Sequence, residues 1–307
     1  MTAQPHVLAV IVLYAQEPTH ARTLTGLAAA FAEDPALASA LNLLVWDNSP
    51  DSEPGRGPRA QAVAALPLPC RYQAATRNEG VSGAYNAAAE VAAAGSHRWL
   101  LLLDQDTSVT LSYLRAMLAS LEAADAEATV AAIVPLLYAG DFQLSPRLWR
   151  FARHVPLPPP ARPGREDREI FAANSGTLIR TRALRAVGGY SRRFWLDYSD
   201  IELFHRLHRQ GWAAWIVPQA ALQHEIAMMD YNGRMSPERY AIYLAAESDF
   251  LDLYRSLAER LMHLGRLAVR VVRQRQLRNP AFSRMSAQEL LRRIARRRRS
   301  RLTDRAV

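Results

Sequence analysis

Hydrophobic and polar positions in the first 135 residues alternate between two patterns. Short continuous apolar runs predict strands that are buried on both faces, as at the centre of a parallel sheet between helices. Alanine-rich segments with helical spacing separate these runs. The expected strands are 7–14, 41–47, 99–104 and 130–135, and the expected helices are 19–33, 81–94 and 111–124. This order predicts right-handed βαβ crossovers and an α/β fold with a mostly parallel sheet flanked by helices.

The pattern changes after residue 140. Prolines, arginines and scattered aromatic residues without a period fill 141–168, which we expect to be a long loop. A strand in 171–180 and a short helix closed by glycine in 182–190 follow. The later half of 194–212 is helical in pattern, and 213–218 is an apolar strand.

The C-terminal region reads as amphipathic helices. We expect Ser236 to cap a helix with Pro237 at its first position. Apolar residues from Phe250 to Val271 recur at spacings of 4 and 3, which predicts one continuous apolar stripe. A further helix is expected to start at Ser286, where "SAQE" forms a capping box with Glu289. Five arginines lie largely off the stripe: Arg255, Arg260, Arg266, Arg270 and Arg273.

Charge is concentrated at the C-terminus. All 38 basic residues are arginine, which excludes the usual P-loop NTPases, Schiff-base enzymes and lysine general bases. Sixteen arginines and three acidic residues lie in 255–307, so this segment carries +13 of a chain whose net charge is +9, and 1–254 carries −4. Any argument for binding to nucleic acid or a membrane therefore concerns the tail alone.

The sequence also predicts where the protein is located and in which redox compartment. No apolar run approaches the roughly 18 residues that span a bilayer, and 7–13 lacks a basic flank and a cleavage-like segment. Cys70 is a single cysteine, so it forms no internal disulfide, in agreement with a reducing compartment. We expect a soluble cytoplasmic protein.

In the sequence "RWLLLLDQDTS", an apolar strand that we expect to be buried is followed directly by two aspartates. In open α/β sheets the ligand lies beyond the carboxyl ends of the strands, so Asp104 and Asp106 would be presented to it. Two carboxylates so close together repel each other unless a cation lies between them. A solvated acidic turn is the alternative for this short pattern. A dinucleotide-binding enzyme is disfavoured, because no G-x-G-x-x-G follows the first strand.

Several motifs together carry a family resemblance. They are "WDNSPD", "RNEGVSGAYN", "DQD", "NSGTLIR", "LDYSDIE" and "QHE". In this order the chain resembles a family 2 glycosyltransferase of the GT-A fold, closest to the rhamnosyltransferase-like branch, over about 7–225. The resemblance implies a catalytic domain at 1–235, with a nucleotide-binding half at 1–135 and an acceptor-binding half at 136–235. A basic amphipathic helical tail follows at 236–307.

The resemblance implies a group of residues that bind the nucleotide or donor. Asp47 matches the carboxylate that accepts the imide N–H of a pyrimidine base, a suitable role for an acceptor-only side chain. Gly80 would let the backbone approach the ligand at a helix start. The family usually has Asn after the tyrosine that ends the first strand, whereas this chain has Ala15. The implied residues are Tyr14, Asp47, Asn78, Gly80, Asn86 and Asp104.

The resemblance also implies a metal site and a base. Asp104, Asp106 and His224 match ligands of Mg²⁺ or Mn²⁺, which would take up charge as the diphosphate leaves. Asp200 matches the catalytic base of an inverting transfer. The residues that would contact sugar or acceptor are Ser175, Gly176, Asp197 and Glu202. Carboxylates at the start of a helix also complement its dipole, which is the structural alternative for Asp197, Asp200 and Glu202.

The implied function is metal-dependent inverting transfer of a sugar from a dTDP- or UDP-sugar to a cell-surface glycan or lipid-linked acceptor, with dTDP-rhamnose as the donor implied by the branch. Two alternatives stay open: a non-catalytic GT-A-like scaffold that binds a nucleotide, and a haloacid dehalogenase-type phosphatase, which normally adds a downstream lysine. Relatives in the branch carry an Arg-Asn pair where this chain reads "YLAAESDF".

Three hypotheses fit the arginines of 255–307. A basic amphipathic helix pair can lie on an anionic membrane surface, which would place the protein on the inner face of the cytoplasmic membrane. Alternatively, the apolar stripe packs on the catalytic domain or on a second copy of the chain. Nucleic-acid binding is the weakest hypothesis, because few aromatic residues lie among the arginines.

Overall fold

The computed structural model describes residues 6–50, 57–150, 153–223, 231 and 235–303. The chain divides into two compact units. Unit 1 comprises Met1–Trp149 and His154–Glu225, and unit 2 comprises Arg150–Arg153 and Ile226–Val307. Each unit is described separately below.

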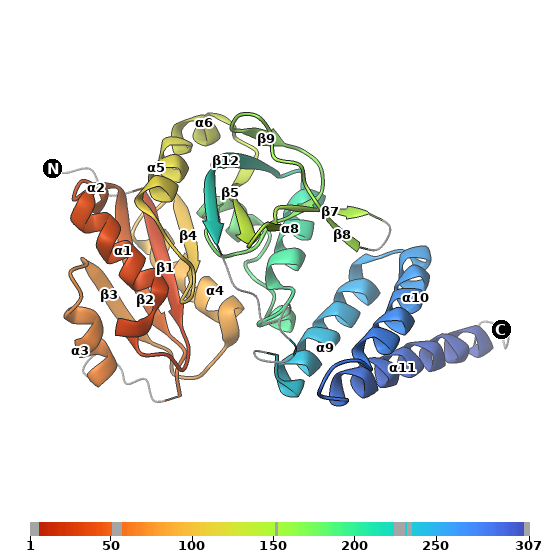
Figure 1. Ribbon diagram of the computed structural model, residues 1–307. Helices are drawn as coiled ribbons and strands as arrows, with labels where there is room; N and C mark the ends of the chain where they lie inside the picture. The colour runs from red at the N-terminus through yellow and green to blue at the C-terminus, as the bar shows by residue number, and fades with distance from the viewer. Residues whose placement is uncertain (1–5, 51–56, 151–152, 224–230, 232–234, 304–307) are drawn as a thin grey trace. The chain divides into compact units, whose positions relative to one another are not determined.

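Unit 1 is built on a nine-stranded sheet (Figure 1). Its strands are β1 (Val7–Leu13), β2 (Leu41–Asp47), β3 (Cys70–Ala74), β4 (Trp99–Asp104), β5 (Val130–Ala139), β6 (Phe142–Ser145), β9 (Gly164–Glu166), β11 (Leu178–Arg180) and β12 (Ala213–Gln223). Their order is β3-β2-β1-β4-β11-β5-β12-β9, with β6 against β5. The strands from β3 to β4 are parallel, while β11 runs antiparallel between β4 and β5. The sheet is therefore mixed and mostly parallel, as predicted.

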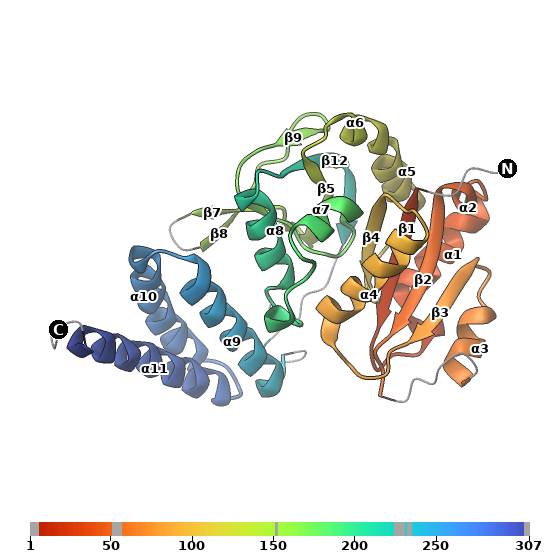
Figure 2. The same ribbon diagram turned by 180° about the vertical axis from the view of Figure 1, so that it is seen from behind.

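Helices cover both faces of this sheet, which keeps its central strands dry. α1 (Arg22–Glu33) and α5 (Leu111–Ala119) lie on one face (Figure 1), and α4 (Gly80–Ala94), α7 (Thr181–Ala186) and α8 (Ser199–Arg209) lie on the other (Figure 2). All of β1 is buried, and so are the five apolar residues of β4. Each fully buried leucine contributes about 1.5–3 kcal/mol. The remaining helical elements of unit 1 are η1 (Pro18–His20), α2 (Leu37–Ala40), α3 (Pro58–Ala64), α6 (Leu121–Ala126) and η2 (Arg192–Phe194).

The segment 141–168 is not the long loop that its composition predicts. It contains β6 and β9 of the main sheet, together with β7 (Arg147–Arg150) and β8 (Arg153–Pro156), which form a three-stranded sheet with β10 (Ile170–Phe171). These strands have two to four residues each, too few for an alternating pattern to be visible. Their partners, rather than their sequence, make them strands.

Unit 2 consists largely of α9 (Pro237–Tyr254), α10 (Leu257–Gln274) and α11 (Ala281–Thr303). The Ser236 cap is confirmed, since its hydroxyl accepts the Arg239 N–H at 3.1 Å. The continuous stripe from Phe250 to Val271 is wrong as a single helix. The backbone leaves the helical conformation at Arg255, and Ser256 starts α10 with a capping box.

The predicted helix start at Ser286 is also wrong. α11 begins at Ala281, and Ser286 lies inside it with no exposed surface. Its hydroxyl donates to Gln274 Oε1 at 2.7 Å and contacts the Tyr240 hydroxyl at 2.6 Å. A serine that matches a capping box therefore serves here as a polar contact in the core of unit 2. Among the described residues, no helix is long and apolar enough to cross a membrane.

Candidate active site

The carboxyl ends of three parallel strands meet at one edge of the sheet in unit 1. The register places Leu13 of β1 opposite Asp47 of β2, and Val12 of β1 opposite Asp104 of β4. Tyr14, which follows β1, is about half exposed, and its N–H donates to Gln105 Oε1 at 2.8 Å. Gln105 therefore ties the turn that carries the two aspartates to the end of β1.

Asp104 is held by a buried tyrosine of α4. The Tyr85 hydroxyl donates to Asp104 Oδ1 at 3.0 Å, and the Tyr85 ring lies 5.3 Å from that of Tyr190. Burial, and after it the charge of Asp104, raises the pKa of Tyr85 well above its usual value. The hydroxyl therefore stays protonated and fixes the orientation of the carboxylate.

Asp200 lies near the same tyrosine pair. Burial, and after it the charges of Asp104 and Asp200, raises the pKa values of Tyr85 and Tyr190. The Asp200 carboxylate accepts the Ile201 N–H at 2.8 Å at the start of α8. Burial raises the pKa of Asp200 to about 6, against the opposing effect of that hydrogen bond and with the charges of Asp197 and Asp104 adding to the rise. A carboxylate with this pKa can accept a proton near neutral pH.

The backbone before Asp200 is in an uncommon conformation. Tyr198, the N-cap residue of α8, has φ = 64°, in the left-handed region. A bulky residue rarely adopts this conformation, and it persists only where the surroundings enforce it. This turn lies between Asp197 and Asp200, so it helps to set how the two carboxylates are presented.

Glu202 is buried and ion-paired in this structure. It is 1% exposed and forms a two-point ion pair with Arg206, at 2.6 and 2.8 Å. Arg206 in turn donates to the backbone carbonyl of Val187, and to that of Gly189 at 2.7 Å. The pair therefore anchors the chain between α7 and α8, and the contact of Glu202 with sugar or acceptor stays a prediction.

Asp47 is fully buried, and protein groups already bind its carboxylate. Oδ2 accepts from Arg59 Nε at 2.6 Å and from the Tyr72 hydroxyl at 2.9 Å, and Oδ1 accepts the Ser49 N–H at 3.0 Å. Burial alone would raise the pKa of Asp47, but the hydrogen bonds from Arg59, Ser49 and Tyr72 hold it below its usual value. Asp47 therefore organises this part of the edge through Arg59, and a nucleobase would have to displace one of these donors to bind it.

Asn78, Gly80 and Asn86 form a structural framework around α4. Asn78 Oδ1 accepts the Gly80 N–H at 2.8 Å. Gly80 has φ = +69°, and a Cβ there would lie 2.1 Å from the carbonyl oxygen of Trp195. Glycine is thus required here by a close approach to the protein's own backbone, and the approach of a ligand to Gly80 stays a prediction. Asn86 binds both the N–H of Tyr190, at 2.7 Å, and its carbonyl, at 2.9 Å.

Ser175 and Gly176 connect the strands behind the aspartate turn. The Ser175 hydroxyl is 2% exposed and hydrogen bonds with that of Thr107, the residue after Asp106. The Gly176 N–H donates to the carbonyl of Leu102 in β4 at 2.7 Å. Ser175 therefore holds the end of the aspartate turn, Gly176 binds to β4, and both residues are buried.

The sequence identifies the family. The model for glycosyl transferase family 2 matches residues 9–187, more than half of the chain. The chain belongs to glycosyltransferase family 2. None of the curated proteins compared with it matches the sequence.

Solved structures show the same fold at low identity. "Crystal structure of GalNAc-T7 with UDP, GalNAc and Mn2+" has a TM-score of 0.61 and 14% identity, covering 86% of this chain and 50% of that one. The mannosyltransferase PcManGT from Pyrobaculum calidifontis, in complex with GDP-Man and Mn²⁺, has a TM-score of 0.55 and 15% identity, with 96% and 87% covered. S. aureus TarS 1-349 with UDP-GlcNAc has a TM-score of 0.50 and 14% identity, with 84% and 69% covered. This family member therefore has the GT-A fold, and it spans half the length of the GalNAc-T7 chain.

The aspartate turn offers suitable ligands for a divalent cation. Asp104 and Asp106 are partly exposed and supply only oxygen, the donor type that Mg²⁺ and Mn²⁺ accept readily. The predicted third ligand, His224, lies outside the described residues. Within the part of the chain that the structure describes, no three His, Cys, Asp or Glu side chains form a metal-binding group. The donor set thus fits a cation that also takes ligands from a bound diphosphate and water.

The site residues predicted from the sequence do not include four residues that support the site. Tyr85, Tyr190, Arg59 and Arg206 each bind or adjoin a candidate acid. For Tyr85 a signal existed, because a tyrosine on the apolar face of a helix needs an acceptor for its hydroxyl. For the two arginines none existed, since 38 arginines in the chain make any single pairing unpredictable.

Proposed function

We propose that this protein is a metal-dependent, inverting glycosyltransferase that uses a nucleoside diphosphate sugar. The observation that supports this most strongly is that Asp104 and Asp200 lie close enough to Tyr85 and Tyr190 for both charges to add to the effect of burial on the pKa values of these tyrosines. One acid ends a strand at the edge where ligands bind, and the other has a pKa of about 6. Membership of glycosyltransferase family 2 supports a role for both acids in glycosyl transfer.

Asp200 acts as the base in this proposal. As the acceptor hydroxyl attacks C1 of the donor sugar, its proton passes to the Asp200 carboxylate and its oxygen forms the new glycosidic bond. The bond from C1 to the diphosphate breaks on the opposite face, so the anomeric configuration inverts. The nucleoside diphosphate leaves with the bonding electrons.

Asp104 and Asp106 hold the cation in this proposal. A bound Mg²⁺ or Mn²⁺ supplies positive charge to the diphosphate as it becomes the leaving group. Tyr85 keeps Asp104 in position through its hydroxyl, and Gln105 anchors the turn to β1. Asp197 lies beside the base, where its charge helps to keep the pKa of Asp200 high.

Donor and acceptor are finer parts of the proposal. A dTDP- or UDP-sugar is the proposed donor, with rhamnose as the sugar suggested by the resemblance. The proposed acceptor is a glycan or lipid-linked precursor, reached from the cytoplasmic side of the membrane. The proposal does not use Glu202, because Arg206 already binds its carboxylate.

A donor screen tests the proposal. Purified protein is melted with dTDP-, UDP- and GDP-sugars, with and without Mn²⁺, and hydrolysis of each nucleotide sugar is measured. We expect one nucleotide class to raise the melting temperature in Mn²⁺, to lose that effect with chelator, and to be hydrolysed. A non-catalytic scaffold would bind without hydrolysis. A phosphatase would instead release phosphate from monoesters, and that result would overturn the proposal.

A further inference from the structure

Asn174, in the segment between β10 and β11, joins two hydroxyl groups near the proposed base. Its Oδ1 accepts from the Tyr190 hydroxyl at 2.7 Å, and its Nδ2 donates to the Ser199 hydroxyl oxygen at 3.1 Å. All three residues are buried. An amide suits this position because one end accepts a hydrogen bond while the other end donates one.

Ser199 closes the turn that precedes the proposed base. Its hydroxyl donates to the Leu196 carbonyl at 3.2 Å, across the left-handed residue Tyr198. Ser199 is also the first residue of α8, directly before Asp200. The Asn174 amide therefore binds this turn at the residue next to the base.

The next two residues of the same segment hold the aspartate turn and β4. The Ser175 hydroxyl hydrogen bonds with that of Thr107, at the end of the aspartate turn. The Gly176 N–H donates to the Leu102 carbonyl at 2.7 Å, and Leu102 lies in β4 two residues before Asp104. Consecutive residues of one short segment thus contact both turns that carry candidate acids.

The other end of the Asn174 amide binds a tyrosine that α4 fixes. Asn86 accepts the N–H of Tyr190 at 2.7 Å and donates to its carbonyl at 2.9 Å. The Tyr190 ring lies 5.3 Å from that of Tyr85, whose hydroxyl binds Asp104. The amide is therefore held in place from the side of Asp104 as well.

We propose that Asn174 is a positioning residue of the transfer reaction, which holds the turn before Asp200 in a fixed relation to the aspartate turn. The inference rests on the proposed function, in which Asp200 is the base and Asp104 is a metal ligand. Displacement of a reacting group by about 1 Å can cost about 10²-fold in rate. A buried amide that binds the base turn prevents such a displacement.

The test compares Asn174→Leu with the wild type, because leucine keeps the branched shape of the side chain and removes both hydrogen bonds. The aspartate turn keeps its own contacts. We therefore expect kcat to fall about 10–100-fold, while the dissociation constant of the donor in Mn²⁺ changes by less than about twofold. Ser199→Ala, a milder change, should lower kcat in the same direction. Donor titration and transfer rates at saturating donor measure both quantities.

A double-variant cycle shows whether Asn174 acts through Asp200. Asp200→Asn lacks the base, so the addition of Asn174→Leu should lower its residual rate by less than about twofold. A residue that only supports the fold would lower the rates of Asp200→Asn and the wild type equally, and that result would overturn the inference.

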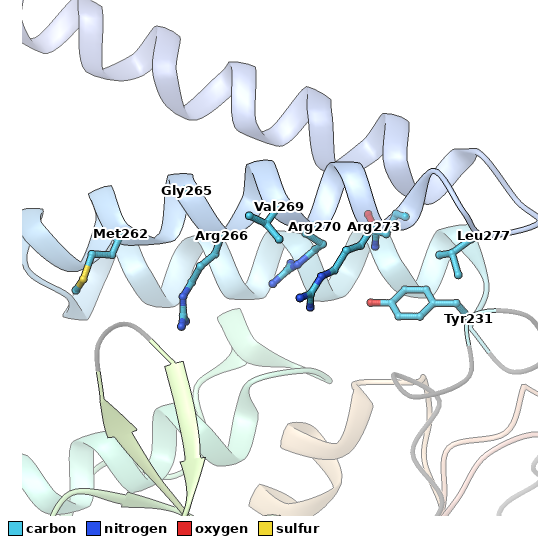
Figure 3. Close-up of a pocket in the computed structure, with 9 residues that line it drawn as sticks. Tyr231, Met262, Gly265, Arg266, Val269, Arg270, Arg273 and Leu277 are labelled. Atoms are coloured by element: carbon cyan, nitrogen blue, oxygen red, sulfur yellow. The ribbon is translucent and has the colours of Figure 1, made fainter.

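Unit 2 contains a matched control. Gln274 of α10 is a buried amide that donates to the Tyr240 hydroxyl at 2.8 Å and accepts from the Ser286 hydroxyl at 2.7 Å. It is one of the residues that line a pocket along this helix (Figure 3). Gln274→Met removes a buried amide of the same kind, and we expect it to keep the wild-type kcat. Thermal melts establish that each variant is folded at the assay temperature, and Ser199→Ala carries the test if Asn174→Leu is unfolded.

The outcomes separate this inference from the proposed function. Full kcat in folded Asn174→Leu and Ser199→Ala, beside an inactive Asp200→Asn, would overturn this inference alone. Equal losses of kcat in Gln274→Met and Asn174→Leu would do the same. An absence of transfer by the wild type with every nucleotide sugar would overturn the proposed function, and this inference with it.

Discussion

Asp200 is the residue whose surroundings tell most about the chemistry. Its carboxylate follows a left-handed tyrosine, sits in a buried setting, and lies within reach of the charges of Asp197 and Asp104. Burial, and after it the charges of Asp197 and Asp104, disfavour the ionised form of Asp200, so its proton affinity rises. The Asp200 side chain is therefore protonated and neutral in acid, and it can act as a base above its pKa.

Transfer should therefore depend on pH with a single acidic limb. Asp200 must be deprotonated to accept a proton, so kcat/KM should be full above the folded-state pKa and fall tenfold per pH unit below about 6. A profile of kcat/KM from pH 4.5 to 8 measures this, since it reports the free enzyme. A flat profile down to pH 5 would show that another group is the base.

The backbone conformation at position 15 bears on the departure from the family, which usually has asparagine where this chain has Ala15. It has φ = 49°, in the left-handed region, where asparagine is more favourable than alanine. Its side chain is exposed, and its N–H donates to the Ser49 hydroxyl at 2.9 Å. Ala15→Asn should raise the free energy of unfolding by about 1 kcal/mol. Denaturant unfolding measures this, with Ala15→Val as the destabilising comparison.

The predicted strand ends allowed the candidate acids to be chosen from the sequence. They did not allow prediction of the residues that contact these acids. Asp104 could be placed at the ligand edge because a dry strand runs directly into it. That Asp47 would be enclosed by Arg59 and Tyr72 could not be predicted, since the partners come from a separate helix and strand. The close approach of Gly80 to Trp195 is equally a property of tertiary packing.

At the scale of elements, apolar spacing predicted helices well and their boundaries poorly. The stripe from Phe250 to Val271 keeps a helical period across a break, because α9 and α10 both bury apolar faces. The break is made by Ser256, which forms a capping box with Glu259. The side chain of each residue accepts the backbone N–H of the other. Local capping therefore decided the ends of two helices that hydrophobicity alone joined.

The capping box should be measurable as stability. Ser256→Ala removes the hydroxyl that accepts the Glu259 N–H at 3.3 Å, which should lower the free energy of unfolding by about 1 kcal/mol. Calorimetric melting of the variant beside the wild type gives the difference. An unchanged melting temperature would mean that tertiary packing of α10 alone fixes its start.

At the scale of the whole molecule, the fold class and the distribution of charge could be predicted from the sequence, whereas short strands and tertiary contacts could not. The alternation of strands and helices gave the α/β class, because a parallel sheet covered on both faces leaves a strong apolar signal. The short antiparallel strands between 142 and 171 left none. The concentration of arginine in 255–307 was plain from sequence, whereas the ion pair of Arg270 with the buried Glu247 depends on how α9 and α10 pack together.

The central claim is that donor binding and proton removal belong to different carboxylates of one site. Titration of the donor in Mn²⁺, together with transfer rates, compares the wild type with Asp104→Asn and Asp200→Asn. Asp141→Asn, an exposed acid in the turn between β5 and β6, is the control. We predict that Asp104→Asn loses donor binding, while Asp200→Asn keeps it and loses transfer by about 10²–10⁴-fold. Normal transfer by Asp200→Asn would contradict the account.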